Sequence, residues 1–359
     1  LVNVQQTIAR GSAGTDINAI PVTAIERIEV LRDGAAAQYG SDAIAGVINI
    51  VLKKQTKETQ LFFEAGQTRE GDGTVLHGGL NHGFALGDDG FLNVSVEYRD
   101  REETNRAGPD TLRVNPPRVT QRIGDADAKD AYLWLNGGIE LGGGELYWFG
   151  GLSQRKGDSS GFYRSAGDGR TVPELYPNGF LPNIITTVED GSLAVGYRSQ
   201  IGDTWDWDVS VNHGRGKFGF FERNSVNVSW WYEPNPIIGA PIPVPYRQSP
   251  TSADTGTLKF DQTTVNLDFR GSIEIGSSEP LSLAVGGEYR NENYAIEAGD
   301  PVSHSYGRTN NPAIIILNQN GGFAAPGIQG FPGFSPNEEV DDGRNSYALY
   351  VDAETRFGG

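Results

Sequence analysis

Aromatic and cationic side chains gather in two long segments, residues 157–191 and 216–262, that are rich in proline and glycine. Aromatic rings can stack on the flat rings of a ligand, and guanidinium groups bind anions. The candidates for ligand binding are Tyr163, Arg164, Trp230, Trp231 and Tyr232. The alternative for the same aromatic residues is a hydrophobic cluster that only stiffens a loop.

Residue types that do covalent chemistry or hold metals are scarce. The chain has no cysteine and four histidines, and only His77 and His82 are near each other. Five positions apart, these two would lie on opposite faces of a strand, so no metal site is expected. No Ser-His-Asp spacing or carboxylate pair stands out, so we expect no enzyme, no catalytic residue and no cofactor. The net charge of −17 argues against nucleic acid as a partner.

The elements that must carry these segments are β-strands. From about residue 60 apolar and polar residues alternate, as in FLNVSVEYRD at 91–100, which is typical of strands with two different faces. No stretch reaches the roughly 20 apolar residues of a transmembrane helix. Strands that cross an outer membrane need only about 10 residues each. The ten expected strands lie near 60–68, 74–85, 91–101, 131–142, 145–156, 192–201, 205–215, 263–275, 281–296 and 345–358.

After the first short connection, the connectors between these strands alternate between tight and long. The tight ones are 86–90, 142–144, 202–204 and 276–280, and the long ones are 102–130, 157–191, 216–262 and 297–344. Outer-membrane barrels have short turns on the periplasmic side and long loops outside, whereas a Greek-key sandwich has no reason to keep this parity. The pattern predicts an all-β, antiparallel transmembrane β-barrel in outer-membrane lipid. Within the last loop, AIIIL (313–317) should form a short strand or pack on a neighbouring loop.

The stretch IERIEVLRDGAAAQYGSDAIAGVINIVLKK, residues 25–54, does not follow this pattern. It resembles the end of the plug domain of TonB-dependent outer-membrane receptors over some thirty residues, with Asp33-Gly34 and Ala45-Gly46 as departures that recur in the family. The matching motif positions are Glu26, Glu29, Gly34, Tyr39, Gly40, Gly46 and Asn49. We therefore expect the C-terminal part of a small α+β plug domain in residues 1–56. Residues 57–359 should be the N-terminal portion of the barrel, about ten of a probable 22 strands.

The resemblance implies an importer of a Gram-negative outer membrane. In this family the external loops and the plug bind a scarce, bulky solute, and TonB with ExbB and ExbD then pulls on the plug through a segment upstream of it. The chain starts without methionine or a signal peptide, so we expect it to belong to a longer exported precursor that carries this segment. A ferric siderophore is the commonest ligand of the family. Uptake of an oligosaccharide or another nutrient, or ligand sensing with a signalling role, are the alternatives.

The resemblance also suggests a latch between plug and barrel. In some members of the family, plug arginines pair with acids of the barrel lumen. The corresponding residues here would be Arg27 and Arg32 in the plug and Glu97, Glu288 and Glu354 in the barrel. The alternative for each glutamate is an ordinary solvated lumen wall.

Overall fold

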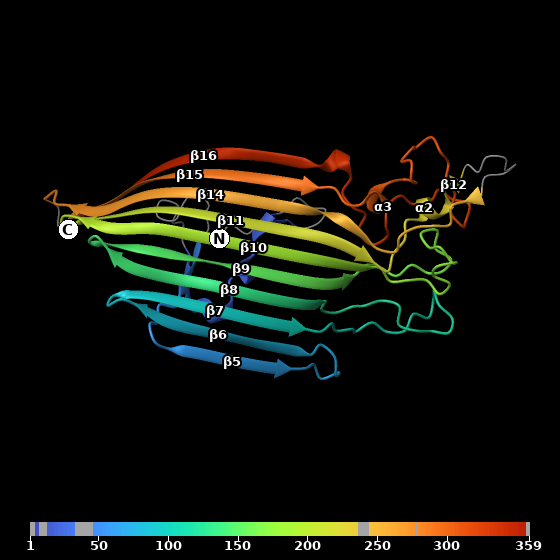
Figure 1. Ribbon diagram of the computed structural model, residues 1–359, viewed down its shortest axis with the longest axis horizontal. Coiled ribbons are helices and arrows are strands. Elements are labelled where there is room, and N and C mark those ends of the chain that lie inside the picture. The colour runs from blue at the N-terminus through green and yellow to red at the C-terminus, as the bar shows by residue number, and fades with distance from the viewer. Residues whose placement is uncertain (1–3, 7–12, 33–45, 236–243, 277–278, 357–359) are drawn as a thin grey trace.

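Ten antiparallel strands form one continuous sheet in which each strand pairs with the next long strand along the chain (Figure 1). The computed structural model describes residues 4–6, 13–32, 46–235, 244–276 and 279–356. The strands are β5 (Thr59–Gly66), β6 (Val75–Leu86), β7 (Gly90–Arg101), β8 (Asp127–Leu141), β9 (Gly144–Ser160), β10 (Asn183–Ile201), β11 (Trp205–Arg223), β14 (Ala253–Ile273), β15 (Leu281–Glu297) and β16 (Val340–Glu354). This order confirms the ten predicted strands and the all-β, antiparallel fold class.

The tight turns and the long loops lie at opposite ends of this sheet (Figure 1). The turns after Leu86, Leu141 and Ile201 were predicted to within about two residues. At the loop ends the strands are longer than predicted, since β10 starts at Asn183 instead of 192 and β14 at Ala253 instead of 263. Hydrophobic alternation marks only the part of a strand with one apolar face. Strand segments with polar residues on both faces carry no such signal.

The two faces of the sheet have different surroundings. On β7, Asn93, Ser95 and Glu97 are buried on the face toward the N-terminal segment, while Val96 and Tyr98 are exposed on the other face. Large apolar side chains are exposed along that second face, among them Leu61, Phe63, Leu80, Leu152 and Leu349. An exposed apolar face of this extent fits contact with lipid. Each helix among the described residues is too short or too polar to span a lipid bilayer.

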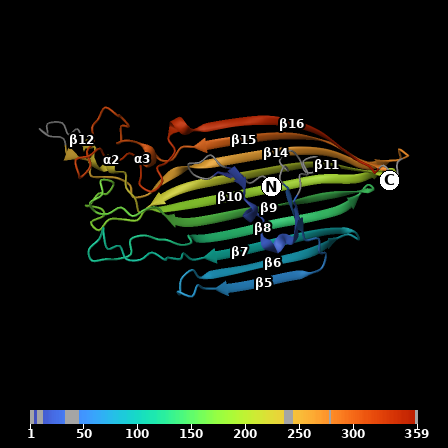
Figure 2. The same ribbon diagram turned by 180° about the vertical axis from the view of Figure 1, so that it is seen from behind.

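The N-terminal residues form a small separate unit that lies against the inner face of the sheet (Figure 2). It contains the strand pair β1 (Val4–Gln6) and β2 (Ala13–Thr15) and the pair β3 (Ile25–Leu31) and β4 (Val47–Leu52), with two 3-10 turns, Ile17–Ala19 and Val22–Ala24, between them. Ile20 and Ala24 are buried against Trp134 of β8, with Ile25, Ile50 and Leu52 packed around them. Apolar contact therefore seats this unit, the plug segment (residues 4–56), on the sheet.

The long loops add short elements at one end of the sheet. These are α2 (Val228–Tyr232), α3 (Pro301–His304), a 3-10 turn at Pro336–Glu338 and the two-residue strands β12 (Pro234–Asn235) and β13 (Val244–Pro245), which pair with each other. The predicted apolar segment AIIIL packs on the neighbouring loops through Ile316, which is buried in one cluster with Val172 and Val226. Leu317 forms an isolated bridge with Phe323 of its own loop.

Candidate functional site

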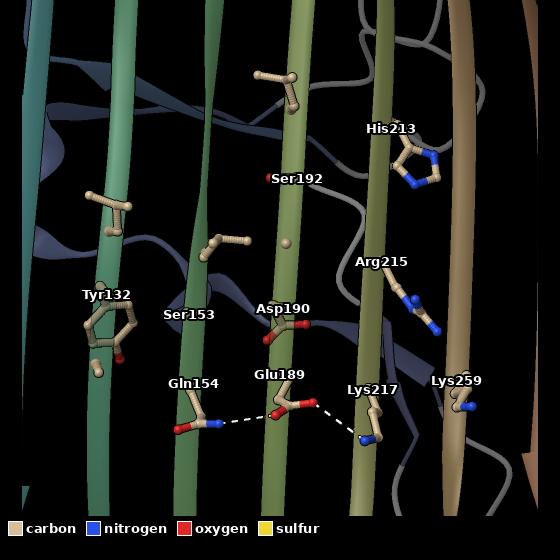
Figure 3. A pocket seen from close by; sticks show the side chains of 15 residues that line it. Tyr132, Ser153, Gln154, Glu189, Asp190, Ser192, His213, Arg215, Lys217 and Lys259 are labelled. Atoms are coloured by element: carbon tan, nitrogen blue, oxygen red, sulfur yellow. Dashed lines mark hydrogen bonds and ion pairs between the residues drawn. The ribbon is translucent and has the colours of Figure 1, made fainter.

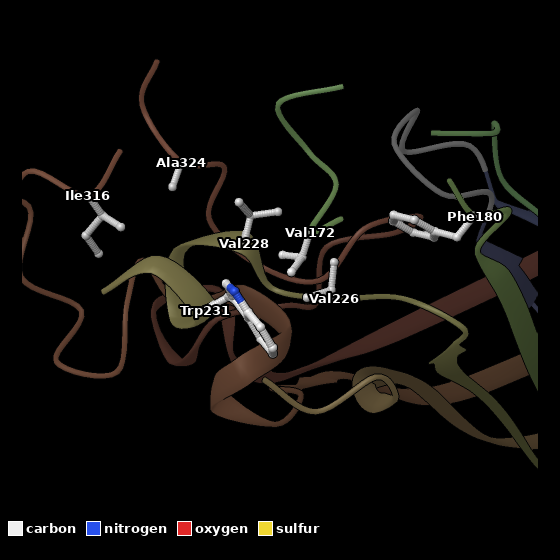
Figure 4. Close-up of a cluster of buried hydrophobic side chains, with 7 residues drawn as sticks. All are labelled: Val172, Phe180, Val226, Val228, Trp231, Ile316 and Ala324. Atoms are coloured by element: carbon white, nitrogen blue, oxygen red, sulfur yellow. The ribbon is translucent and has the colours of Figure 1, made fainter. Parts of the chain in front are cut away.

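Three long loops share one hydrophobic core at the outer end of the sheet (Figure 4). The loops span residues 161–182, 224–252 and 298–339. The buried side chains of this loop core are Val172, Phe180, Val226, Val228, Trp231, Ile316 and Ala324. Because each loop contributes at least two of them, the three loops form one packed body.

The aromatic triplet lies on α2 but does not form a flat platform. Asn227 caps this helix, with its Oδ1 accepting a hydrogen bond from Trp230 N at 3.1 Å. Successive helical residues point about 100° apart, so Trp231 is only 8% exposed in the loop core while Trp230 points toward Ser305. Tyr232 packs against the loop core. For Trp231 the expectation of an open binding surface is therefore wrong, and the alternative of a loop-stiffening cluster fits.

Arg308, which no sequence pattern singles out, joins two of the loops. Its guanidinium lies 4.6 Å from the ring centre of Trp230 and 4.7 Å from that of Tyr246, so it contacts both rings. The carboxylate of Glu233, which is buried, accepts a hydrogen bond from Arg308 N at 2.8 Å. Glu233 and Arg308 are 75 positions apart, and no local pattern relates them.

Tyr163 and Arg164 make hydrogen bonds to nearby loop residues. Tyr163 is buried, its hydroxyl donates to the carbonyl of Asn178, and it accepts from Nη2 of Arg118 at 3.1 Å. Arg164 donates through Nη1 to the carbonyl of Phe162 at 2.7 Å, and burial lowers its pKa. Nε of Arg164 is buried without a hydrogen-bond partner among the described residues. No hydrogen bond or ring contact within the described residues joins Tyr163 or Arg164 to α2.

The outer surface of the loops is hollowed next to the loop core. A cavity of about 550 Å³ is lined by Tyr306, Asn310, Pro312, Ile314, Ile315, Phe323, Ala324 and Pro326. Phe323 is 76% exposed and Ile315 is also exposed. This loop hollow combines an open aromatic ring with aliphatic walls, which suits an apolar or aromatic part of a ligand.

The plug segment contacts the sheet through Glu97. Glu97 is 7% exposed, and its Oε2 accepts hydrogen bonds from both N and Oγ1 of Thr23, each at 3.0 Å. Its other oxygen, Oε1, lies 2.8 Å from Nε2 of His77 on β6. Glu97 therefore reaches the plug segment, but through a threonine instead of an arginine. Thr23 lies two positions before the first residue of the IERIEV motif, and this closeness was its only signal in the sequence.

An ion pair also joins the two parts, with a polarity opposite to the prediction. Nη1 of Arg155 on β9 lies 3.7 Å from Oδ2 of Asp16 in the plug segment. Arg155 also pairs with Asp130, which is fully buried and lies 2.9 Å from Nη2 of Arg99. In this ion pair the barrel supplies the cation and the plug segment supplies the acid.

The remaining residues of the predicted latch do not meet across the junction. Arg27 pairs with Glu29 at 2.7 Å and with Glu26 at 3.4 Å, both on its own strand. Arg32 has no ion pair among the described residues. Glu288 pairs with Arg290 on its own strand at 2.9 Å, and Glu354 is exposed at the end of β16. Nearby charges on the same strands take the place of the expected long-range pairs.

Three of the predicted motif positions, Gly34, Tyr39 and Gly40, lie outside the described residues. Gly46 has a φ of +148°, and a Cβ there would lie 2.5 Å from the carbonyl oxygen of Leu31. Asn49 donates to Glu29 at 2.8 Å and so ties β4 to β3. Within the described residues no group of three or more His, Asp or Glu side chains could hold a metal ion.

Comparison with known proteins gives a family match for the plug segment and relatives for part of the chain. Residues 2–47 match the family model described as TonB-dependent Receptor Plug Domain. The probable TonB-dependent siderophore receptor PirA of Acinetobacter baumannii is 61% identical over 103 residues, which are 28% of this chain and 13% of that protein. The vitamin B12 transporter BtuB of Vibrio cholerae is 37% identical over 89 residues, 24% of this chain and 14% of that protein.

Solved structures share the fold over most of the chain. The ferric enterobactin receptor PfeA of Pseudomonas aeruginosa has a TM-score of 0.59 at 14% identity, over 96% of this chain and 44% of that one. The siderophore receptor PirA has a TM-score of 0.51 at 20% identity, over 79% of this chain and 38% of that one. The chain thus spans less than half the length of the relatives it matches.

Proposed function

The chain belongs to the TonB-dependent receptor family, and we propose that it is part of an outer-membrane importer for a scarce, bulky solute. The observation that carries this proposal is the plug segment seated on the inner face of a ten-stranded meander whose long loops all lie at one end. A plug closes a lumen that would otherwise be open to water. A ligand captured by the outer loops would therefore enter only after the plug has moved.

We assign residues 1–56 to the plug domain and residues 57–359 to the barrel. Two plug-side carbonyls accept hydrogen bonds from the barrel wall, at Lys53 from Asn136 (2.8 Å) and at Gln55 from Asn93 (2.6 Å). The first strand of the sheet begins directly afterwards, at Thr59. TonB, energised by ExbB and ExbD, would act from the periplasm on a segment that precedes the plug.

For the ligand we propose a ferric siderophore or another iron complex. PirA and PfeA carry siderophore or ferric enterobactin in their names, and the exposed ring of Phe323 in the loop hollow suits the aromatic part of such a ligand. The 37% identity to a vitamin B12 transporter makes a corrinoid the second candidate. Tyr163, Arg164, Trp230 and Tyr232 would support the ligand-binding loops from below their surface.

The test is uptake by a deletion strain that expresses the whole receptor. Cells are supplied with radioactive iron bound to a catecholate siderophore or with radioactive cyanocobalamin. Iron uptake that is lost with the gene supports the proposal, whereas uptake of cobalamin alone would replace the ligand. Phe323→Ala should weaken binding to the cells by about tenfold, the order expected for a buried ring contact. Phe162→Ala, at a similarly exposed loop ring, serves as the matched control and should leave binding unchanged.

A further inference from the structure

The outward face of the sheet carries a hollow of about 940 Å³ across strands β8 to β14 (Figure 3). One part of its lining is apolar and consists of Leu133, Leu152 and Leu193. The other part carries His213, Arg215 and Lys217, which follow one another at alternate positions of β11. An apolar region thus borders directly on a cationic one.

Neighbouring residues show that this hollow lies outside the barrel wall. Asn212 lines a different cavity together with Ile20 and Ile48 of the plug segment, so its side chain is on the inner face. Side chains alternate between faces along a strand, and His213 and Arg215 therefore point outward. In the register between β10 and β11, Leu193 lies opposite His213, which places it on the same outward face.

The cationic part lies at the height where a lipid headgroup would be. β11 leaves its tight turn at Trp205 and carries Val209 and Val211 outward before His213. From Trp205 to Lys217 is about 40 Å along a strand, or roughly 30 Å of height at the usual barrel tilt. The apolar band of such barrels is about 25 Å tall, so Arg215 and Lys217 lie just above it, on the side of the long loops.

The charges around the hollow leave these cations available to a ligand. Lys217 lies 3.5 Å from Glu189, and Arg215 lies 3.5 Å from Asp261. Both pairs are partly exposed to solvent, and such pairs contribute only about 0–1 kcal/mol.

The floor of the hollow is open at Gly191. This residue has no side chain to fill the floor, where a Cβ would lie 3.0 Å from Cδ2 of Leu152. Lys259, which pairs with Glu297, completes the cationic edge.

We propose that this hollow binds a lipid of the outer leaflet that has a phosphate headgroup. The phosphate lies against Arg215 and Lys217, and an acyl chain runs along Leu152 and Leu193 past Gly191. The inference rests on the proposed function, because it requires the sheet to stand in an outer membrane. Phosphate oxygens are better acceptors for these two cations than the exposed carboxylates of Glu189 and Asp261, since a lipid phosphate excludes water above an apolar surface.

The experiment counts lipids bound to the whole receptor. Purified receptor in phosphatidylcholine nanodiscs is titrated with lipid A, and bound lipid is measured by native mass spectrometry. The double variant R215Q/K217Q should lose about tenfold or more in lipid A affinity, and Glu189→Gln should bind more tightly because an acid is removed. The matched control, R344Q/R356Q, changes two exposed cations outside this hollow and should bind like the wild type.

The outcomes separate this inference from the proposed function. Unchanged lipid A affinity in R215Q/K217Q would overturn the lipid site even if iron uptake is intact. Displacement of lipid A by excess inorganic phosphate would also overturn the lipid site, because the hollow would then recognise a free anion. A receptor that does not fractionate with the outer membrane would overturn the proposed function itself.

Discussion

Thr23 and Glu97 join the plug segment to the barrel wall through one carboxylate oxygen, which lies 3.0 Å from both N and Oγ1 of the threonine. His77 holds the other oxygen at 2.8 Å. Gly79 lies opposite Glu97 in the register of β6 and β7, and a Cβ at Gly79 would clash with Cγ2 of Thr23. The close approach of the two parts thus depends on a glycine as well as on an acid.

Removal of the Glu97 carboxylate should loosen the plug segment. Glu97→Ala leaves the buried N–H of Thr23 without its acceptor, which costs about 1–3 kcal/mol. We expect amide hydrogens of residues 17–31 to exchange about tenfold faster, as measured by mass spectrometry on the whole receptor. Glu64→Ala removes an exposed carboxylate that lies 3.8 Å from the other nitrogen of His77 and serves as the control. Equal effects of the two substitutions would show that Glu97 does not hold the plug segment.

A methyl group at Gly79 should displace the same contact from the barrel side. In Gly79→Ala the new Cβ would meet Thr23 and lie 2.8 Å from Cε1 of Phe62, and overpacking of this kind costs about 1–3 kcal/mol. The adjacent Gly78 faces outward, where a Cβ would lie 3.5 Å from its nearest neighbours. Gly78→Ala should therefore leave hydrogen exchange of the plug segment unchanged. The prediction fails if both alanine variants behave alike.

The sequence predicts the strand ends at the tight turns, but it does not predict the contact between Thr23 and Glu97. The strand ends at Ile201 and Trp205 were predicted correctly, because a glycine turn separates two alternating segments there. The start of β14 was missed by ten residues, since its outer part has only two large apolar residues at alternate positions, Leu258 and Phe260. Thr23 and Glu97 are 74 positions apart, and neither residue type identifies the other as its partner.

The aromatic triplet marks a similar limit at the site. Sequence alone places Trp230 and Trp231 side by side in a loop, but not on a five-residue helix that turns one ring toward Ser305 and the other into the core. The helix depends on its cap at Asn227 and on contacts with residues more than 70 positions away. The role of each tryptophan is therefore set by tertiary packing.

Substitution of Trp231 should separate the three packed loops. Trp231→Ala removes a ring that is almost fully buried in the loop core, and large-to-small changes of this type cost about 3–5 kcal/mol. We expect a protease to cut the loops 161–182 and 298–339 much faster in this variant, with the barrel still intact. Phe162→Ala truncates an exposed ring and should give the wild-type digestion pattern. Identical digestion of Trp231→Ala and wild type would show that the loop core does not hold the three loops together.

Glu222 should make the docking of the last loop depend on pH. It is the eighteenth residue of β11, about 55 Å along the strand from Trp205 and so well above the apolar band. It is fully buried, its Oε1 accepts from Phe331 N at 3.1 Å, and its Oε2 has no hydrogen-bond partner among the described residues. Burial raises the pKa of this carboxyl to about 9. The docked loop therefore holds Glu222 protonated at neutral pH.

The sign of the effect follows from proton linkage. Because the pKa of Glu222 is higher with the loop docked than with the loop free, docking takes up a proton and weakens as pH rises toward 9, by at most about tenfold per pH unit. Burial lowers the pKa of His304 on α3 below its usual 6.5, so His304 is already neutral above pH 7 and does not contribute there. Hydrogen exchange of residues 325–335, corrected for the intrinsic rate, should show protection that falls between pH 7 and 9. Glu222→Gln keeps an acceptor for Phe331 N and should give protection independent of pH, while a falling curve in this variant would assign the effect to another group.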